Sequence, residues 1–445
     1  MKYFILLLIS ILINFISWNY FGILFIVNLF ILFYISNQFQ NLSFAKKTII
    51  LLSFYLCLNI SATFWLLEVD VSDAILTYIA NSILFLLFSA PLFLKNIKFR
   101  HFFFIIFWIC GEILLTKWDL AWPWLNFGNV LGNQWYLIQW YSYCGIYGGS
   151  LWILLTALNI FHISKQKKMD KWLFTFFLLI LFPIISLYNY SFNKETTKIN
   201  KIEKFTCFIP QKKYSNYSRT KKLHNYILKN NINHTIITTE LFYSNVYSDY
   251  LKSSDISFFY NDLFKRNDSL KFIIGSEIIN NDSIKFNGIT CFNKNYTLFR
   301  TKKRYVPGTE FITPILRPLF GKSFYTKNYS DDTSKILNSI KTTPFVCYES
   351  IFSDFVASFH SDKIIVLTSE AFLGDNKFGK NQYLNIQRIR AIENNRYLLK
   401  SSYNGYSCII NPQGKIIKKL KPNFNSVSLP LIQSKSFYQK LIQSL

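Results

Sequence analysis

A thiol ends a short apolar segment in the second half of the chain. Residues 344–346 (Pro-Phe-Val) are typical of the end of a buried strand, and Cys347, Tyr348 and Glu349 follow directly. A strand that stops in this way presents a side chain at its carboxyl tip, where a thiol can act as a nucleophile. Of the seven cysteines, Cys347 alone has the charged sequence neighbours that favour a thiolate, and the others are predicted to be packing residues.

Two charged residues upstream of Cys347 complete a set that can transfer an acyl group. Glu240 follows an apolar run, and Lys302 begins a basic run that leads to Glu310. Attack of a thiolate on an acyl ester needs a base for the thiol proton, a cation beside the tetrahedral oxyanion and an acid for the leaving alcohol. We therefore predict that Cys347 is the nucleophile, Glu240 the shuttling base and Lys302 the cation for the thiolate and the oxyanion.

Three further residues are predicted to support this set. Glu310, eight residues beyond Lys302, can orient the lysine or assist the acid–base step. Glu349 lies two residues beyond Cys347, so on a continued strand the two side chains would share a face. Tyr348 lies between Cys347 and Glu349 in the sequence. Taken singly, each charged residue has an ordinary explanation, such as a solvated lysine or a helix cap, and only order and context together favour chemistry.

The elements that must position these residues are short strands and helices. Apolar runs typical of strands lie at 205–209, 233–239, 271–276, 287–292, 343–347, 363–368 and 406–410. Candidate helices lie at 217–230, 331–340, 350–360 and 382–396. A β-rich core with interspersed helices predicts a layered α/β domain over residues 191–445.

The first half of the chain is predicted to lie in a membrane. Its apolar runs occupy 3–17, 20–36, 47–67, 74–94, 101–116, 136–163 and 172–190. Most of them approach the ~20 residues that a spanning helix needs, so residues 1–190 are predicted to be a transmembrane domain of about seven spans. The Trp-rich segment 118–129 is predicted to be an interfacial loop or half-helix, and Trp65 is predicted to be part of an aromatic belt at the membrane edge.

Charge predicts the orientation of these spans. The connections after the second, fourth and sixth runs carry basic residues within 46–47, 95–100 and 165–171, whereas the connection after the third run carries only acidic ones within 68–73. Basic connections stay on the cytoplasmic side of a membrane. The N-terminus is then inside, and residues 191–445 lie on the outer face of the plasma membrane.

Composition agrees with a chain divided in this way. The 445 residues are 51% hydrophobic and only 16% charged, too apolar for a soluble enzyme and too polar for a protein wholly in lipid. The formal net charge of +25 comes without a nucleic-acid motif, and either a compositional bias towards Lys, Asn, Ile, Phe and Tyr or attraction to anionic headgroups explains it. Because no CxxC or HxxH spacing occurs, we expect no metal site. We also expect no cofactor and no nucleic-acid partner.

Several segments, in order along the chain, resemble one family: the apolipoprotein N-acyltransferases, the membrane-bound branch of the nitrilase (carbon–nitrogen hydrolase) superfamily. The similar segments are 122–128 (Trp-Pro-Trp-Leu-Asn-Phe-Gly), 145–151, 305–310 (Tyr-Val-Pro-Gly-Thr-Glu), 315–319, 346–349 (Val-Cys-Tyr-Glu), 388–393 (Arg-Ile-Arg-Ala-Ile-Glu), 404–405 and 411–414. In this family the motif at 305–310 follows the catalytic lysine by three residues, which selects Lys302 over Lys303.

The resemblance implies a fold, a reaction and a location. The outer domain would be an α-β-β-α sandwich of the nitrilase type. The protein would take an acyl chain from a membrane phospholipid, hold it as a thioester on Cys347 and pass it to the N-terminal amine of a diacylglyceryl-cysteine lipoprotein, on the periplasmic side of a bacterial inner membrane. Two alternatives stay open: a membrane-tethered amidase of the same superfamily, and a non-catalytic scaffold that binds the lipid moiety.

The chain departs from the usual family pattern around these motifs. Thr239 stands where a Pro usually precedes the base, residues 369–374 (Ser-Glu-Ala-Phe-Leu-Gly) differ from the usual Asn-Asx-Ala/Gly-Trp-x-Gly, Tyr383 replaces a His and Tyr403 replaces an Asn. The chain also stops at Leu445 without the usual last span, so we expect an outer domain tethered at one end. The departures remove no predicted catalytic residue, and they bear on substrate fit and efficiency.

Overall fold

The computed structural model describes residues 2–95, 97, 99–165, 170–192, 202–211, 215–312, 323–326, 342–432 and 434–445. The chain divides into two compact units. A helical unit comprises Met1–Thr196, Asp375–Glu393 and Ser436–Tyr438, and a sheet unit comprises Thr197–Gly374, Asn394–Lys435 and Gln439–Leu445. The helix predicted at 331–340 and the motif at 315–319 lie outside the described residues.

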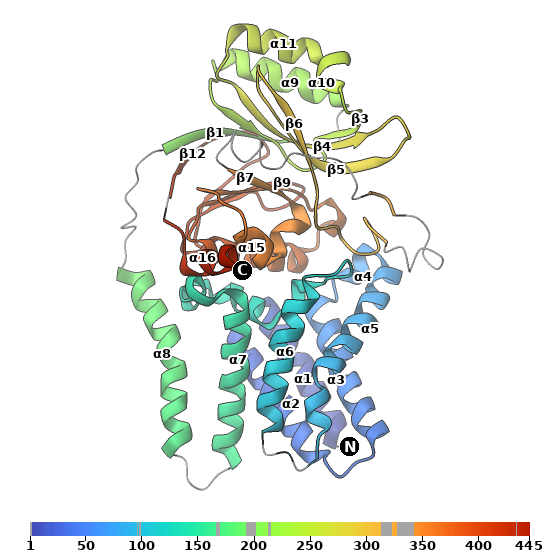
Figure 1. Cartoon of the computed structure of the whole chain (residues 1–445), viewed down its shortest axis with the longest axis vertical. Coiled ribbons are helices and arrows are strands. Elements are labelled where there is room, and N and C mark those ends of the chain that lie inside the picture. The colour runs from blue at the N-terminus through green and yellow to red at the C-terminus, as the bar shows by residue number, and fades with distance from the viewer. Residues whose placement is uncertain are drawn as a thin grey trace. The chain divides into compact units, whose positions relative to one another are not determined.

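The helical unit consists of long apolar helices joined by short turns (Figure 1). Its elements are α1 (Lys2–Asn19), η1 (Gly22–Leu24), α2 (Phe25–Gln38), α3 (Phe44–Thr63), α4 (Leu66–Val69), α5 (Val71–Phe88), η2 (Ala90–Phe93), α6 (Arg100–Leu115), η3 (Pro123–Leu125), η4 (Phe127–Leu137), α7 (Tyr141–Lys165) and α8 (Asp170–Phe192). Each of the seven predicted apolar runs falls on one of the longer helices.

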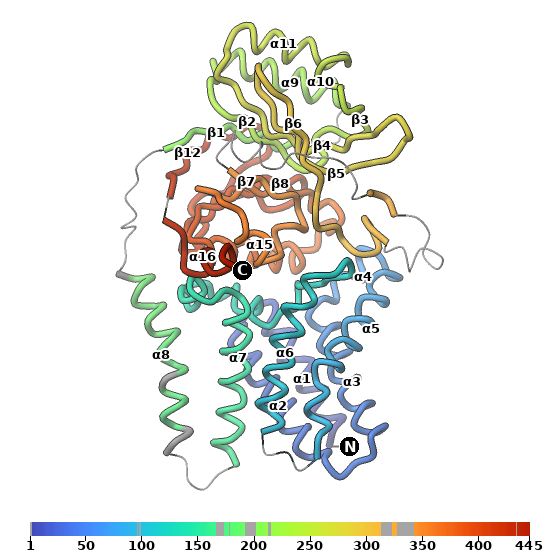
Figure 2. The backbone as a smooth tube through the Cα atoms, viewed as in Figure 1, coloured from blue at the N-terminus to red at the C-terminus, as the bar shows by residue number. Residues whose placement is uncertain are grey.

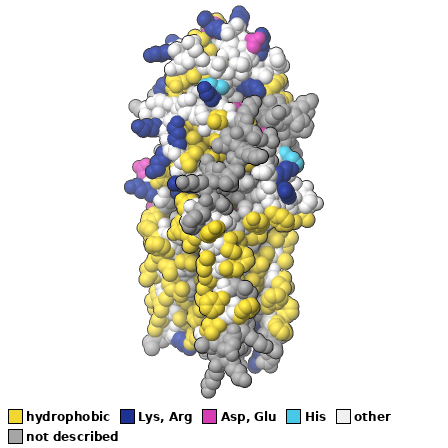
Figure 3. Space-filling view, turned by 90° about the vertical axis from the view of Figure 1, so that its left-hand side faces the viewer, with side chains coloured by type: hydrophobic (Ala, Val, Ile, Leu, Met, Phe, Trp, Pro, Cys, Tyr) yellow, Lys and Arg dark blue, Asp and Glu magenta, His cyan; other side chains and the backbone are white. Residues whose placement is uncertain are grey.

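Five helices among the described residues are long and apolar enough to cross a membrane, by length and composition. They are α1, α3, α5, α7 and the stretch Leu173–Ser191 within α8, and Gly22–Gln38 is a shorter apolar helix. Hydrophobic side chains cover this unit on the face shown in Figure 3. Such an apolar exterior is what lipid requires of a helical surface.

Buried amides join the first helices of this unit. Asn14 of α1 donates to the Leu58 carbonyl and to the Ser61 hydroxyl of α3, at 2.8 and 2.7 Å. Asn81 of α5 donates to Asn59 of α3 at 2.6 Å. Because a polar group in an apolar interior needs a partner, these bonds favour one packing of α1, α3 and α5 over others.

A helix from late in the sequence belongs to this unit by its contacts. In α15 (Lys377–Asn394), the side-chain oxygen of Gln382 accepts from the indole nitrogens of Trp65 and Trp124, at 3.1 and 2.9 Å. Its amide nitrogen donates to Asn19 and to the Ala62 carbonyl. Trp65 is only 1% exposed, so its prediction as an aromatic-belt residue was wrong. A buried amide needs several partners, and the indole of Trp65 is one of them.

The sheet unit contains two sheets (Figures 1 and 2). The larger has the order β12-β1-β2-β4-β5-β6, with β3 paired to β4, and the smaller has the order β11-β10-β9-β8-β7. Their strands are β1 (Ile202–Ile209), β2 (Thr235–Ile237), β3 (Tyr243–Tyr247), β4 (Lys271–Ile279), β5 (Lys285–Phe292), β6 (Thr297–Thr301), β7 (Thr343–Val346), β8 (Ile364–Ser369), β9 (Leu398–Tyr403), β10 (Cys408–Ile410), β11 (Ile416–Lys419) and β12 (Asn423–Pro430).

The two sheets pack face to face, because alternate residues of their strands share one buried cluster. That core includes Phe205, Cys207, Ile237, Ile273, Ile289, Val346, Ile365, Leu367, Leu399 and Ile409. The other face of the larger sheet is covered by α9 (Asn216–Lys229), α10 (Tyr250–Ser253) and α11 (Ser257–Arg266), through residues such as Leu223, Tyr250 and Leu263. The unit also contains α14 (Ser353–Ala357), η6 (Cys347–Ile351), η7 (Ala371–Leu373) and most of α16 (Phe437–Ser444).

Strand direction explains where the predicted residues meet. Strands β1, β2 and β4 run parallel, and so do β7, β8 and β9. Glu240 follows the carboxyl end of β2, Cys347 follows β7, and Ser369 is the last residue of β8. Carboxyl ends of parallel strands lie at one edge of a sheet, which is the usual place for a site in such folds.

Candidate active site

The chain turns sharply at Cys347. Strand β7 ends at Val346, and Cys347, the first residue of η6, adopts a positive φ of 42°. A non-glycine residue in this left-handed region is strained, and such strain persists where surrounding contacts hold it. The turn also shows that the expectation of a continued strand was wrong, so Glu349 does not share a strand face with Cys347.

Glu349 instead braces the turn. One carboxylate oxygen accepts from Arg300 at 2.9 Å and from the Lys303 amide at 2.6 Å, while the other accepts from Arg300 at 2.5 Å and from the Val346 amide at 2.8 Å. Arg300 and Glu349 are both fully buried, and Arg300 also donates to the Pro344 carbonyl. Sequence reasoning missed Arg300, although its place two residues before Lys302 puts both side chains on one side of β6 and its extension.

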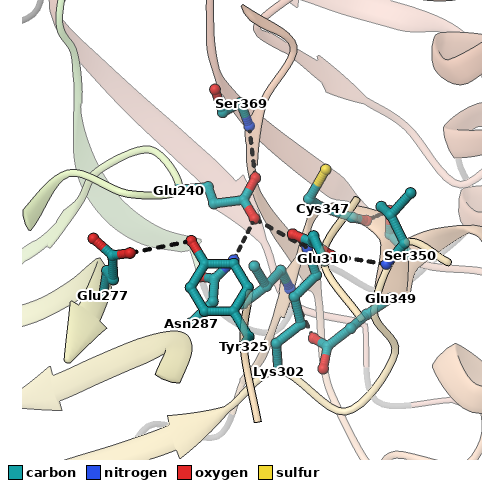
Figure 4. A network of polar contacts seen from close by, with 12 residues as sticks. Glu240, Glu277, Asn287, Lys302, Glu310, Tyr325, Cys347, Glu349, Ser350 and Ser369 are labelled. Carbon is teal, nitrogen blue, oxygen red and sulfur yellow. Dashed lines mark hydrogen bonds and ion pairs between the residues drawn. The ribbon is translucent and has the colours of Figure 1, made fainter. Parts of the chain in front are cut away.

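Glu240 is held at both carboxylate oxygens. One accepts from Lys302 at 3.2 Å and from the Asn287 side chain at 3.0 Å, and the other accepts from the backbone amide of Ser369 at 2.9 Å. Figure 4 shows these bonds converging on Glu240 from β5, from the end of β6 and from the end of β8. A carboxylate fixed in this way presents one defined orientation to a nearby proton. Asn287 and Ser369 were not predicted from the sequence.

Lys302 lies fully buried between two carboxylates. Its amine is 3.2 Å from Glu240 and 2.7 Å from Glu310, and its backbone amide donates to the Asn287 carbonyl at 2.8 Å. Burial by itself would lower the pKa of Lys302, but the charges of Glu240 and Glu310 raise that pKa well above its usual value. The ammonium is therefore charged at any physiological pH, as an oxyanion partner requires.

Glu310 is placed by a tight turn after Lys302. Its second carboxylate oxygen accepts from the Val306 amide at 2.8 Å, and its own amide donates to the Val306 carbonyl. Gly308 supplies the positive φ of 83° that this turn requires. Burial raises the pKa of Glu310, and Lys302 opposes that rise. The geometry supports the role of orienting the lysine, because Glu310 bonds to the lysine amine directly.

The surroundings of Cys347 favour the thiol over the thiolate. Burial raises the pKa of Cys347, the charge of Glu240 raises it further, and Lys302 opposes the rise without cancelling it. The sequence predicted a thiolate, whereas the buried site places two carboxylates as well as one cation around the sulfur, which favours the protonated thiol. In Figure 4 Cys347 lies next to Glu240 and Glu310.

Two comparisons place the chain in a family. Residues 7–159 match the model of the apolipoprotein N-acyltransferase N-terminal domain, and residues 259–439 match that of the carbon-nitrogen hydrolases. Proteins named apolipoprotein N-acyltransferase are similar over most of the chain: one from Rickettsia bellii at 26% identity, covering 74% of this chain and 69% of its own, and one from Rickettsia typhi at 26%, covering 88% and 84%. The chain belongs to the apolipoprotein N-acyltransferase family.

A carbon-nitrogen hydrolase from Helicobacter pylori is among the similar solved structures, at 12% identity and a TM-score of 0.39, covering 55% of this chain and 93% of that one. The sheet unit has the nitrilase-like fold that the carbon-nitrogen hydrolase model describes. The family match and the long apolar helices indicate that this chain is a membrane protein. The family match also indicates that it is an acyltransferase.

Two departures from the family pattern leave the site's contacts in place. At position 369 the bond to Glu240 comes from the backbone amide, so Ser in place of Asn does not alter it. Glu370 is fully buried and pairs with Lys400, and it also accepts from the Ser402 hydroxyl at 2.7 Å. A buried charge needs such a partner.

Two buried tyrosines, Tyr348 and Tyr325, lie close to the charged residues of the site. Tyr348 is buried, and burial raises its pKa well above the usual value. Tyr325 donates to Glu277 at 3.4 Å and its backbone amide donates to the Glu310 carbonyl, which joins a second buried carboxylate to the site. In the described ranges, no group of three or more His, Cys, Asp or Glu side chains is arranged to hold a metal ion.

Proposed function

We propose that this protein transfers an acyl chain from a membrane phospholipid, through a thioester on Cys347, to the N-terminal amine of a diacylglyceryl-cysteine lipoprotein. The observation that carries the proposal is the meeting of a thiol, a fixed carboxylate and an ammonium in one buried site. Family membership supports the lipid and lipoprotein substrates, since the relatives are named for that acceptor class.

In the first half-reaction Glu240 takes the proton of Cys347 while the sulfur attacks the ester carbonyl of the phospholipid. Negative charge develops on the carbonyl oxygen, and the ammonium of Lys302 stabilises it. The C–O bond to the glycerol then breaks, and Glu240 returns its proton to the leaving alkoxide. The products are an acyl thioester on Cys347 and a lysophospholipid, and the charge on Glu240 is restored.

In the second half-reaction the neutral amine of the lipoprotein attacks the thioester carbonyl. Glu240 takes a proton from the amine, Lys302 again holds the oxyanion, and the C–S bond breaks as the sulfur recovers a proton from Glu240. The product is an amide, and the enzyme returns to its starting state. Burial of all three residues disfavours water as the competing nucleophile, which supports transfer over hydrolysis.

Glu310, Tyr348 and Glu349 have supporting roles in this proposal. Glu310 keeps the ammonium of Lys302 between two carboxylates, so the cation is held without a substrate. Glu349 keeps the strained turn at Cys347 closed through Arg300. Tyr348 fills buried space beside Cys347, where burial keeps its hydroxyl neutral.

The main competing function is hydrolysis of a small amide, which the match to the carbon-nitrogen hydrolase model favours. The two are separated by giving the purified protein a phospholipid with a labelled acyl chain and a synthetic diacylglyceryl lipopeptide. We expect label in the lipopeptide with the wild-type chain and with Cys110→Ser, an exposed cysteine of the helical unit, and none with Cys347→Ser. Turnover of short amides without any transfer would reject the proposal in favour of the amidase.

We propose that residues 1–190 span the membrane about seven times and that residues 191–445 act on its outer, periplasmic face. Basic residues at 46–47, 95–100 and 165–171 support this orientation. A reporter that is active only outside the cytoplasm should be on when fused after Leu445 and off when fused after Lys165. The reverse pattern would place the site in the cytoplasm, away from exported lipoproteins.

A further inference from the structure

The segment directly after Glu240 is held by one buried cation. Arg219 of α9 donates from one guanidinium nitrogen to the carbonyls of Leu241, at 3.2 Å, and of Phe242. Arg219 is only 8% exposed, and within the described residues no ion pair joins it to a carboxylate. Burying a cation among neutral carbonyls costs free energy. We therefore expect such an arrangement where those carbonyls must keep one position.

Neighbouring residues on the same face of α9 hold the rest of this segment. Asn216 donates to the Ser244 carbonyl at 2.9 Å and accepts from its amide at 3.4 Å. The hydroxyls of Thr220 and Tyr243 lie 2.6 Å apart. Residues three and four apart on a helix share a face, so positions 216, 219 and 220 act on the segment 241–244 together.

The backbone at Glu240 needs this support for two reasons. Leu241 has a positive φ of 51°, which is strained for a residue with a branched side chain. On the other side, Gly275 of β4 lies so close that an added Cβ would stand 2.3 Å from the Thr239 carbonyl oxygen and 2.6 Å from the Glu240 Cα. The backbone of Glu240 is thus confined between Gly275 and the carbonyls that Arg219 holds.

We propose that Arg219 is a positioning residue for the general base: it fixes the strained backbone after Glu240 and so aims the carboxylate at the thiol. The inference rests on the proposed role of Glu240 as base, and Arg219 itself touches no reacting atom. The planar guanidinium suits this task, because its nitrogens are fixed in one plane, whereas an ammonium sits at the end of a flexible chain.

The test measures acylation of Cys347 by p-nitrophenyl butyrate. The full chain in detergent is mixed with this ester, and the initial burst of nitrophenol gives the acylation rate. This activated ester needs neither phospholipid nor lipoprotein, so it reports on the site alone. Displacement of a catalytic group by about 1 Å costs on the order of 10²-fold, so we expect that loss in Arg219→Met and a smaller one in Arg219→Lys. Lys221→Met, which removes an exposed cation from the same helix, should be unchanged.

A double variant separates positioning from a general structural role. In a Glu240→Gln background, where the base is already absent, Arg219→Met should cause no further loss of burst rate. A further loss of similar size there would overturn the inference, and so would an unchanged rate in Arg219→Met alone. Gly275→Ala pushes the same backbone from the opposite side, and it should repeat the pattern if Arg219→Met proves too unstable to purify.

The proposed function and this inference fail in different ways. If Glu240→Gln acylates as fast as the wild type, the base assignment is wrong and the role of Arg219 is rejected with it. If Glu240→Gln is slow but Arg219→Met is not, the base assignment stands and only the inference is rejected. If the burst behaves as expected but no acyl chain reaches a lipopeptide, the positioning role stands and the proposed substrates are rejected.

Discussion

The two sheets of the sheet unit contribute unlike parts to the site. The larger sheet supplies the two charged residues, Glu240 after β2 and Lys302 after β6, together with the side-chain amide of Asn287 on β5. The smaller sheet supplies the sulfur, with Cys347 after β7, and one backbone donor, the amide of Ser369. The proposed nucleophile and its proposed activating groups therefore come from different sheets, and they meet where both sheets present the ends of their strands.

The two sides are also held by different means. The turn at Cys347 is held by a side-chain ion pair between Arg300, on β6 of the larger sheet, and Glu349, in η6 after β7 of the smaller sheet. The backbone at Glu240 is held by a cation on its carbonyls and by a glycine on its other side. Substitutions in the Arg300–Glu349 ion pair and substitutions around Glu240 should therefore differ in their effects on stability and on rate.

The largest effect on the rate of acylation is expected when Glu240, the proposed base, is replaced. Glu240→Gln should slow acylation by about 10²–10⁴-fold, because an amide cannot take the thiol proton. Rapid-quench measurement of the acyl-enzyme gives the rate, and the melting temperature shows whether the fold is kept. An acylation rate within a few-fold of the wild type would mean that another group serves as base.

The largest effect on stability is expected when the ion pair on the nucleophile side is broken. Arg300→Met leaves the Glu349 carboxylate buried without its cation, a loss of about 3–5 kcal/mol in the free energy of unfolding. Chemical denaturation measures this change. The control is Lys294→Met, which breaks a pair with Asp268 at the surface and should cost about 0–1 kcal/mol. Equal losses in both variants would contradict the bracing role of Glu349.

A smaller effect is expected at Glu310. Glu310→Gln keeps an oxygen near Lys302 but removes one of the two charges that hold its ammonium, so acylation should slow by about tenfold. The comparison with Glu240→Gln is the measurement that matters. Losses of the same size would mean that Glu310 takes part in proton transfer rather than orienting the lysine.

The smallest effect concerns pH and has opposite signs for two reactions. Since burial and the charge of Glu240 raise the pKa of Cys347, the thiolate fraction is small at neutral pH and alkylation by iodoacetamide should still be rising at pH 9. Glu240→Gln removes one raising charge, which lowers that pKa and should speed alkylation several-fold at pH 8, although it slows acylation. A plateau below pH 8 would show that the resting sulfur is a thiolate.

The parts of the site that were predictable are those that sequence marks locally. Cys347 and Glu240 each follow a strand-like run, and strand ends meet at a sheet edge, whereas Lys302 was identified from the motif at 305–310 that follows it. In the helical unit each apolar run became a helix, because such runs have few other options in lipid.

The parts that were missed depend on geometry without a local signal. The Ser369 donor is a backbone amide, which every non-proline residue possesses. The left-handed turn at Cys347 occurs at a residue type that rarely adopts it, so a continued strand was the natural and wrong expectation for Glu349. Strand β6, which carries Arg300, mixes polar and apolar residues over five positions and was not recognised. The thiolate was expected because the count of nearby charges was unknown until Glu240, Glu310 and Lys302 were placed together.

The most direct test of the central claim is the mass of the intact protein after incubation with phospholipid and no acceptor. The account predicts one added acyl chain, mapped to Cys347, lost on treatment with neutral hydroxylamine, and absent from Cys347→Ser. A protein that keeps its unmodified mass, or an acyl group mapped to any other residue, would contradict the account.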